Sequence, residues 1–97
     1  MNKYQIKSRA KEDLITISDF IAKNNKNAAI KMLKLFYEKF EEISDNPKIG
    51  KFRDDFAYLG VRFYVVKKKY LIVYTLQDET VYILRVLSSY QDICSKL

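Results

Sequence analysis

The chain has 97 residues, of which 48% are apolar and 31% are charged, and its formal net charge is +6. This length and balance predict a single globular domain that spans residues 1–97. With two glycines and one proline, the sequence excludes long flexible linkers, and no apolar run approaches the length of a membrane span.

Two further features favour a reducing cytoplasm. The first residues lack the apolar core of a signal peptide, and the single cysteine, Cys94, has no partner for an internal disulfide. Because histidine is absent and Cys94 has no neighbour at metal-ligand spacing, we expect no metal site and no cofactor. The sequence also contains no glycine-rich phosphate loop and no serine-triad motif.

The positive charge is concentrated in the middle of the chain. Between residues 46 and 70, Asp54 and Asp55 oppose seven basic residues: Lys48, Lys51, Arg53, Arg62, Lys67, Lys68 and Lys69. Such a charge favours anionic partners, namely nucleic acid, a membrane surface or an acidic protein segment. The alternative is that the charge only keeps the protein in solution.

The first half of the chain predicts a short strand followed by two helices. Residues 4–7 alternate as a strand does, and Ser8 is a suitable N-cap for the helix that follows. An apolar stripe then marks one buried face of this helix, at Ala10, Leu14, Ile17 and Ile21. After a polar break at residues 23–25, a second helical stripe follows at Ala29, Leu33, Phe36, Phe40 and Ile43. Pro47 disfavours helical backbone at Asn46, so we expect the second helix to end at residues 44–46.

The second half predicts three strands, over residues 61–66, 70–76 and 80–87, which are rich in Val, Ile, Leu and Tyr. Residues 67–69 and 77–79 are the expected turns, and such short connections favour an antiparallel meander. Residues 71–73 are apolar on both faces, which suits a central strand.

Together these elements predict an α+β fold in the order β-α-α-β-β-β. Two antiparallel helices are expected to pack on one face of an antiparallel-rich sheet. Ser89 and Asp92 resemble the capping box of a short C-terminal helix. The pattern leaves the pairing of the first strand open.

This order, together with five local motifs, resembles the RelE/ParE superfamily of bacterial toxins over nearly the whole chain. The motifs are AKEDL at residues 10–14, NPKIGK at 46–51, LGVR at 59–62, YLIVY at 70–74 and VYILRVL at 81–87. Each motif is short, and their order and spacing together are typical of the family. The paired strands around Arg62 and Tyr74 are more similar to the ParE-like branch.

The resemblance implies the toxin of a type II toxin–antitoxin system, bacterial and cytoplasmic, with a role in plasmid stabilisation. It implies a hetero-oligomer with a cognate antitoxin and no association with a membrane. ParE-like members inhibit DNA gyrase, which requires a binding surface. RelE-like members cleave messenger RNA on the ribosome, which requires an acid, a base and cationic clamps.

Two features favour the ParE-like reading. Leu71 stands where RelE carries an arginine, and the uncharged stretch from Ser88 to Gln91 stands where RelE carries a basic cluster. Ser88 and Gln91 also replace a histidine and an arginine that the family often carries, so these two positions lack the roles of those side chains. A phosphorane without cationic clamps is not stabilised, so we expect a non-enzymatic inhibitor of gyrase. The alternatives are a RelE-like endoribonuclease, and a basic α+β binding module or inactive toxin relic.

The candidate functional residues follow from these readings. If the protein is a nuclease, the candidates are Arg62, Arg85, Tyr90 and Asp92. The candidates for contact with the target or the antitoxin are Lys51, Arg53, Arg62, Lys67, Lys68, Lys69 and Arg85.

Several candidates also have a purely structural interpretation. Tyr90 could pack the last helix against the sheet, and Asp92 could cap that helix. Arg62 could pair with a helix carboxylate, and the three lysines could form a solvated turn. Arg85 lies on the face of Val81 and Ile83 if alternation holds, either in a functional groove, which we favour, or near the sheet rim.

Overall fold

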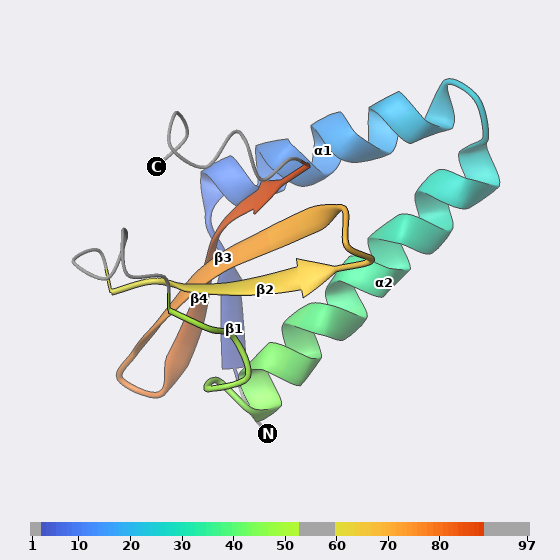
Figure 1. Cartoon of the computed structure of the whole chain (residues 1–97). Helices are drawn as coiled ribbons and strands as arrows, with labels where there is room; N and C mark the ends of the chain where they lie inside the picture. Colours follow the sequence, from blue (N-terminus) through green and yellow to red (C-terminus); the bar gives the residue numbers. More distant parts are fainter. Residues whose placement is uncertain (1–2, 53–59, 89–97) are drawn as a thin grey trace.

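The computed structural model describes residues 3–52 and 60–88. These residues form a four-stranded sheet with two helices on one face, as the sequence predicts (Figure 1). In chain order the elements are β1 (Lys3–Ile6), α1 (Ser8–Ala22), α2 (Lys26–Asp45), β2 (Arg62–Val66), β3 (Tyr70–Gln77) and β4 (Thr80–Leu87). The predicted short C-terminal helix, at residues 89–97, lies outside the described residues.

The helix ends are only partly those predicted. Ser8 is the first helical residue of α1; the N-cap is Lys7, and no side chain caps this end, so the predicted serine cap is wrong. The second helix does have a side-chain cap, because Asn25 Oδ1 accepts a hydrogen bond from Ala28 N at 3.1 Å. α2 ends at Asp45, two residues before Pro47, as predicted. Neither described helix is long and apolar enough to cross a membrane.

The strand order is β1-β4-β3-β2. β2, β3 and β4 form the predicted antiparallel meander, and β1 pairs in parallel with β4, the pairing that the sequence left open. The parallel pairing requires a crossover, which α1 and α2 supply. Each hairpin turn has two consecutive residues at positive φ, a backbone conformation that matches the twist of the paired strands. These residues are Lys67 and Lys68 in the β2–β3 turn, and Asp78 and Glu79 in the β3–β4 turn.

The sheet is apolar on both faces. Phe36 and Phe40 of α2 pack with Ile72 and Ile83 in the core between the helices and the sheet. On the opposite face a second cluster contains Val61, Phe63, Leu71, Val73 and Leu87. β3 is therefore buried on both faces, as its continuous apolar sequence predicts.

A β-bulge in β4 changes the direction of the residues after it. Val73 pairs with Arg85 but Tyr74 pairs with Ile83, so β4 has one extra residue, Leu84. Val86 joins Ile83 in the helix-side core although the two are three positions apart. Strict alternation along β4 therefore does not extend to Arg85.

Candidate functional site

The candidate residues occupy three separate places in the fold, and they do not form one constellation. Arg62 and Lys51 lie at the beginning of β2, the three lysines follow its end, and Arg85 lies on β4. Arg53, Tyr90 and Asp92 lie outside the described residues.

Arg62, at the beginning of β2, contacts the loop that follows α2. Its guanidinium donates a hydrogen bond from Nη1 to Gly50 O at 2.8 Å and lies 4.1 Å from the centre of the Phe52 ring. Lys51 exchanges two backbone hydrogen bonds with Phe63, at 2.9 and 2.8 Å, and so pairs with the outer edge of β2. The side chain of Lys51 remains exposed.

Tyr74 on β3 is the neighbour of Arg62 on the adjacent strand, and its side chain contacts the same loop from the buried side. Its buried hydroxyl donates to Pro47 O at 2.7 Å and accepts from Gly50 N at 2.8 Å. Burial raises the pKa of this hydroxyl, although the Gly50 hydrogen bond and the Arg62 charge oppose the shift. Tyr74 is therefore a protonated structural group at neutral pH.

Arg85 on β4 forms an ion pair with Asp13 on α1. Its guanidinium donates from Nε to Asp13 Oδ2 at 2.8 Å and from Nη2 to Asp13 Oδ1 at 2.9 Å, a bidentate geometry. Asp13 Oδ2 also accepts a hydrogen bond from Val86 N at 2.9 Å. The two side chains are only 13% and 15% exposed, and the hydrogen bond to Asp13 raises the pKa of Arg85 above its ordinary value.

Lys67, Lys68 and Lys69 form the exposed turn between β2 and β3. This turn lies beside α2, where Lys67 lines an open groove of about 460 Å³ together with Lys31 and Lys34. Ala28, Met32 and Leu35 also line the groove. We call this feature the lysine groove.

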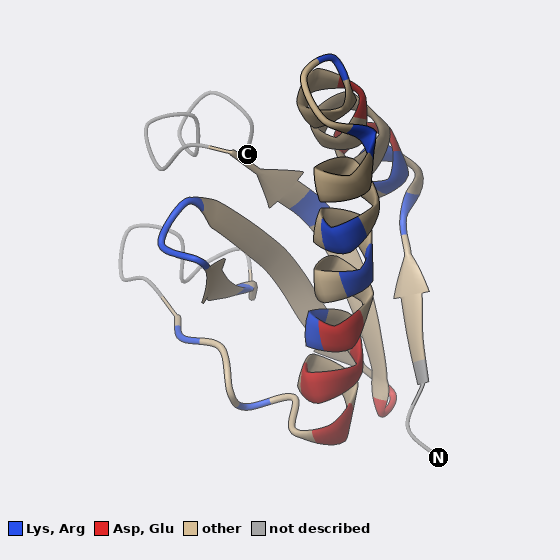
Figure 2. Ribbon diagram, turned by 90° about the vertical axis from the view of Figure 1, so that its right-hand side faces the viewer, with Lys and Arg blue, Asp and Glu red and all other residues tan. Residues whose placement is uncertain are grey.

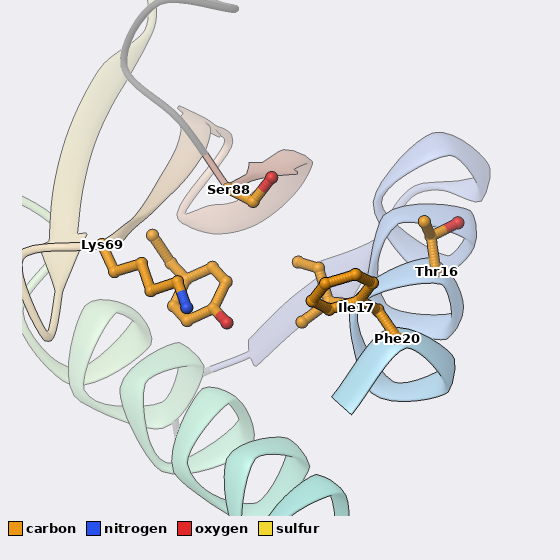
Figure 3. Close-up of a pocket in the computed structure, with 6 residues that line it drawn as sticks. Thr16, Ile17, Phe20, Lys69 and Ser88 are labelled. Atoms are coloured by element: carbon orange, nitrogen blue, oxygen red, sulfur yellow. The ribbon is translucent and has the colours of Figure 1, made fainter. Parts of the chain in front are cut away.

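A second pocket, of about 300 Å³, lies between α1 and the ends of the strands (Figure 3). Its lining is Thr16, Ile17, Phe20, Lys69, Tyr70 and Ser88. Figure 3 shows Ile17 and Phe20 of α1 across the pocket from Lys69. The polar groups in this lining are hydroxyls and one ammonium, so these six residues provide no carboxylate or imidazole for acid–base chemistry.

In the part of the chain that the structure describes, no group of three or more His, Cys, Asp or Glu residues could hold a metal ion.

The sequence pattern missed several residues of these sites. Asp13 gave no signal beyond its place near the start of a helix, and Gly50 and Phe52 belong to a loop whose partners are distant in sequence. Lys31 and Lys34 fall outside the apolar stripe of the second helix, and the local pattern gives them no further role. Their alignment with the 67–69 turn depends on tertiary structure.

Comparison with known proteins identifies the family. The model of the ParE toxin of the type II toxin–antitoxin system parDE matches residues 4–93. The chain belongs to the ParE toxin family. A search of curated proteins finds no match.

Two solved structures are similar to the toxin. A chain of the chromosomal ParDE toxin–antitoxin system from P. aeruginosa has a TM-score of 0.76 and 18% identity, covering 92% of this chain and 97% of that one. A chain of the toxin–antitoxin complex RelBE2 from Mycobacterium tuberculosis has a TM-score of 0.57 and 25% identity, covering 88% and 94%. The first likeness shows the fold, and the family match shows that the protein is a toxin of the ParE type.

Proposed function

We propose that the toxin inhibits DNA gyrase by binding, without catalysing a reaction, and that a cognate antitoxin neutralises it. The observation that carries this proposal is the engagement of both arginines. Arg62 is held by Gly50 and Phe52, and Arg85 is held by Asp13, at separate places in the fold. A phosphoryl-cleaving site needs cationic clamps that converge on one phosphate. A binding surface has no such requirement.

The alternative is a RelE-like endoribonuclease, and one observation favours it. Lys69 and Tyr70 line the same pocket as Ser88, which places an ammonium and a phenol near one another. Lysine and tyrosine side chains are among the groups that the RelE branch uses. The fold is also similar to a chain of the RelBE2 complex.

Apolar side chains on the helices suit an antitoxin. Ile15 and Phe20 on α1 and Ile30 and Tyr37 on α2 are between 45% and 67% exposed. Large apolar side chains left in water are typical of surfaces that a partner covers. We propose that the antitoxin covers these residues in a hetero-oligomer, and that both proteins act in the cytoplasm, where gyrase is found.

The test is a pair of assays with purified toxin. In the first, the toxin is added to gyrase and supercoiled plasmid, and cleaved DNA is measured after protein denaturation. In the second, the toxin is added to translating ribosomes, and messenger RNA is followed by primer extension. We expect cleaved plasmid with intact messenger RNA.

The variants Lys69→Gln and Tyr70→Phe separate the two mechanisms. Messenger RNA cleavage that disappears in both variants, with no effect on gyrase, would establish the nuclease and overturn our proposal. Gyrase inhibition that persists in both variants would support it. Addition of the antitoxin should reverse the inhibition in either assay.

A further inference from the structure

The lysine groove joins two parts of the chain that are far apart in sequence. Lys31 and Lys34 come from α2, and Lys67 comes from the β2–β3 turn, which continues with Lys68 and Lys69. All five lysines are exposed, and no ion pair among the described residues uses any of them. The groove therefore presents three lysine charges against the one carboxylate of Glu38.

The charges along α2 run against its macrodipole. Residues 26–37 contain three lysines and no acidic residue, whereas residues 38–45 contain Glu38, Glu41, Glu42 and Asp45 and one lysine. A helix is stabilised by acidic residues near its beginning and basic residues near its end. α2 has neither in its terminal turns. Lys26 in the first turn is thus unfavourable for the helix, whereas Lys31 and Lys34 lie beyond that turn, where the dipole does not account for their position.

The polarity extends beyond α2. In Figure 2 the blue residues in the first half of α2 and those of the β2–β3 turn lie toward the same end of the molecule, and the red residues of α2 lie toward its other end. The turn itself has a conformational cost, because Lys67 and Lys68 have φ of 54° and 57°. Asparagine and glycine adopt this conformation more readily than lysine does. Lysine at these positions therefore adds charge rather than local stability.

We infer that the lysine groove binds the phosphate backbone of double-stranded DNA. An ammonium is a point charge on a flexible stem, so it suits phosphates at variable positions better than it suits paired recognition of a carboxylate. Lys31, Lys34 and Lys67 line the groove together with the apolar Ala28, Met32 and Leu35, against which long lysine stems can pack. The positive end of the α2 dipole has the same sign as these lysines.

An acidic protein segment is the competing occupant, and the structure favours it less. Such a segment is held largely by apolar anchors. The strongly exposed apolar side chains of α2, Ile30 and Tyr37, do not line the groove. Glu38 also lines the groove, and its charge opposes either anionic occupant equally.

This inference rests on the proposed function only in naming DNA as the physiological polyanion: bound near gyrase, the toxin would contact the DNA that the enzyme holds. Binding of DNA by the toxin alone is a separate property and is tested separately.

The experiment measures fluorescence anisotropy of a labelled 30-base-pair duplex with purified toxin over a range of salt concentrations. Three to five phosphate contacts predict a slope of log K against log salt of roughly −3 to −4.5. The triple variant Lys31→Glu, Lys34→Glu, Lys67→Glu should weaken binding at least about tenfold at low salt and flatten the slope by about 2 to 3.

The matched control is the triple variant Lys11→Glu, Lys23→Glu, Lys48→Glu, which makes the same change in net charge at exposed lysines outside the groove. It should retain most of the affinity. The milder variant Lys31→Gln, Lys34→Gln, Lys67→Gln should show an intermediate loss, with circular dichroism confirming that every variant is folded.

Each outcome decides the inference. Equal weakening by the groove and control variants would show nonspecific attraction to a basic protein and would overturn it, as would a wild type that binds poly-glutamate but not the duplex. Loss of DNA binding in the groove variant alone supports it, even if the wild type has no effect on gyrase. A wild type that inhibits gyrase but binds no DNA refutes the inference and leaves the proposed function standing.

Discussion

At the scale of single residues, glycine is required at position 50 because of a close neighbouring side chain and not because of its backbone conformation. A Cβ at this position would lie 2.5 Å from Tyr74 Oη, well inside contact distance. Gly50→Ala should therefore displace the loop or the tyrosine and lower the free energy of unfolding by about 1–3 kcal/mol. Urea denaturation measures this.

Gly60→Ala is the matched control for Gly50→Ala. Gly60 has a φ of +67°, and a Cβ there would meet nothing within 4 Å, so its cost comes only from backbone strain, about 1 kcal/mol. A Gly50→Ala variant no less stable than the wild type would mean that Tyr74 does not hold the loop as described.

Tyr74 predicts a pH dependence in the alkaline range. Its pKa is raised in the folded state, so the native protein holds the phenolic proton more tightly than the unfolded chain does. The stabilisation is complete below the ordinary pKa of about 10 and is lost as the pH rises toward the folded pKa.

Tyr74→Phe tests this dependence. It should cost about 1–3 kcal/mol at neutral pH, because Gly50 N and Pro47 O lose their partner. The difference in stability between wild type and variant should shrink when denaturation is repeated above about pH 10. A constant difference across this range would contradict the assigned protonation state.

At the scale of elements, the Asp13–Arg85 pair joins the first helix to the last described strand. Asp13→Ala leaves both the guanidinium and Val86 N without this partner, whereas Arg85→Met leaves the Asp13–Val86 hydrogen bond in place. We expect a loss of about 2–3 kcal/mol for Asp13→Ala and about half of that for Arg85→Met. Urea denaturation measures the free energy of unfolding of each variant and shows which of the two loses more stability.

Growth inhibition by Arg85→Met then separates structure from function. If Arg85 has only a structural role, growth inhibition by Arg85→Met should fall only in proportion to the loss of stability. Loss of toxicity in a variant that remains fully folded would instead make Arg85 a contact residue for the target.

The elements themselves follow closely from local sequence. The last predicted strand, residues 80–87, is β4 as observed, and the apolar stripe from Ala10 to Ile17 is buried. Local patterns failed where two arrangements were nearly equivalent: Ser8 does not cap α1, and Met32 is more fully buried than the predicted Leu33. The bulge at Leu84 left no local signal, because it depends on how β3 and β4 pair.

The candidate sites were less predictable for a physical reason. Charge and residue type identified Arg62, Arg85 and the three lysines, but their partners lie far away in the chain. Arg85 and Asp13 are 72 positions apart, and Arg62 and Gly50 are 12 apart. A one-dimensional pattern carries little information about such pairs, so the tethering of both arginines could be learned only from the fold.

At the scale of the whole molecule, the separation of charge predicts how stability responds to salt. The net charge is +6, and Lys31 and Lys34 of α2 line the lysine groove together with Lys67 of the β2–β3 turn. Raising the ionic strength from about 0.01 M to about 0.1 M shortens the Debye length from about 30 Å to about 10 Å. Because the screened interactions are mainly repulsive, the free energy of unfolding should rise by about 0.5–1 kcal/mol.

The double variant Lys31→Gln, Lys34→Gln should be more stable than the wild type at low salt and should gain less when salt is added. Lys11→Gln, Lys23→Gln is the control, with the same change in net charge at the two ends of α1, where the dipole effects oppose one another. If both variants follow the wild-type salt dependence, the lysine groove is not a source of electrostatic strain. If only the groove variant departs from it, the toxin retains lysines at a cost in stability, as expected of a surface that binds a polyanion.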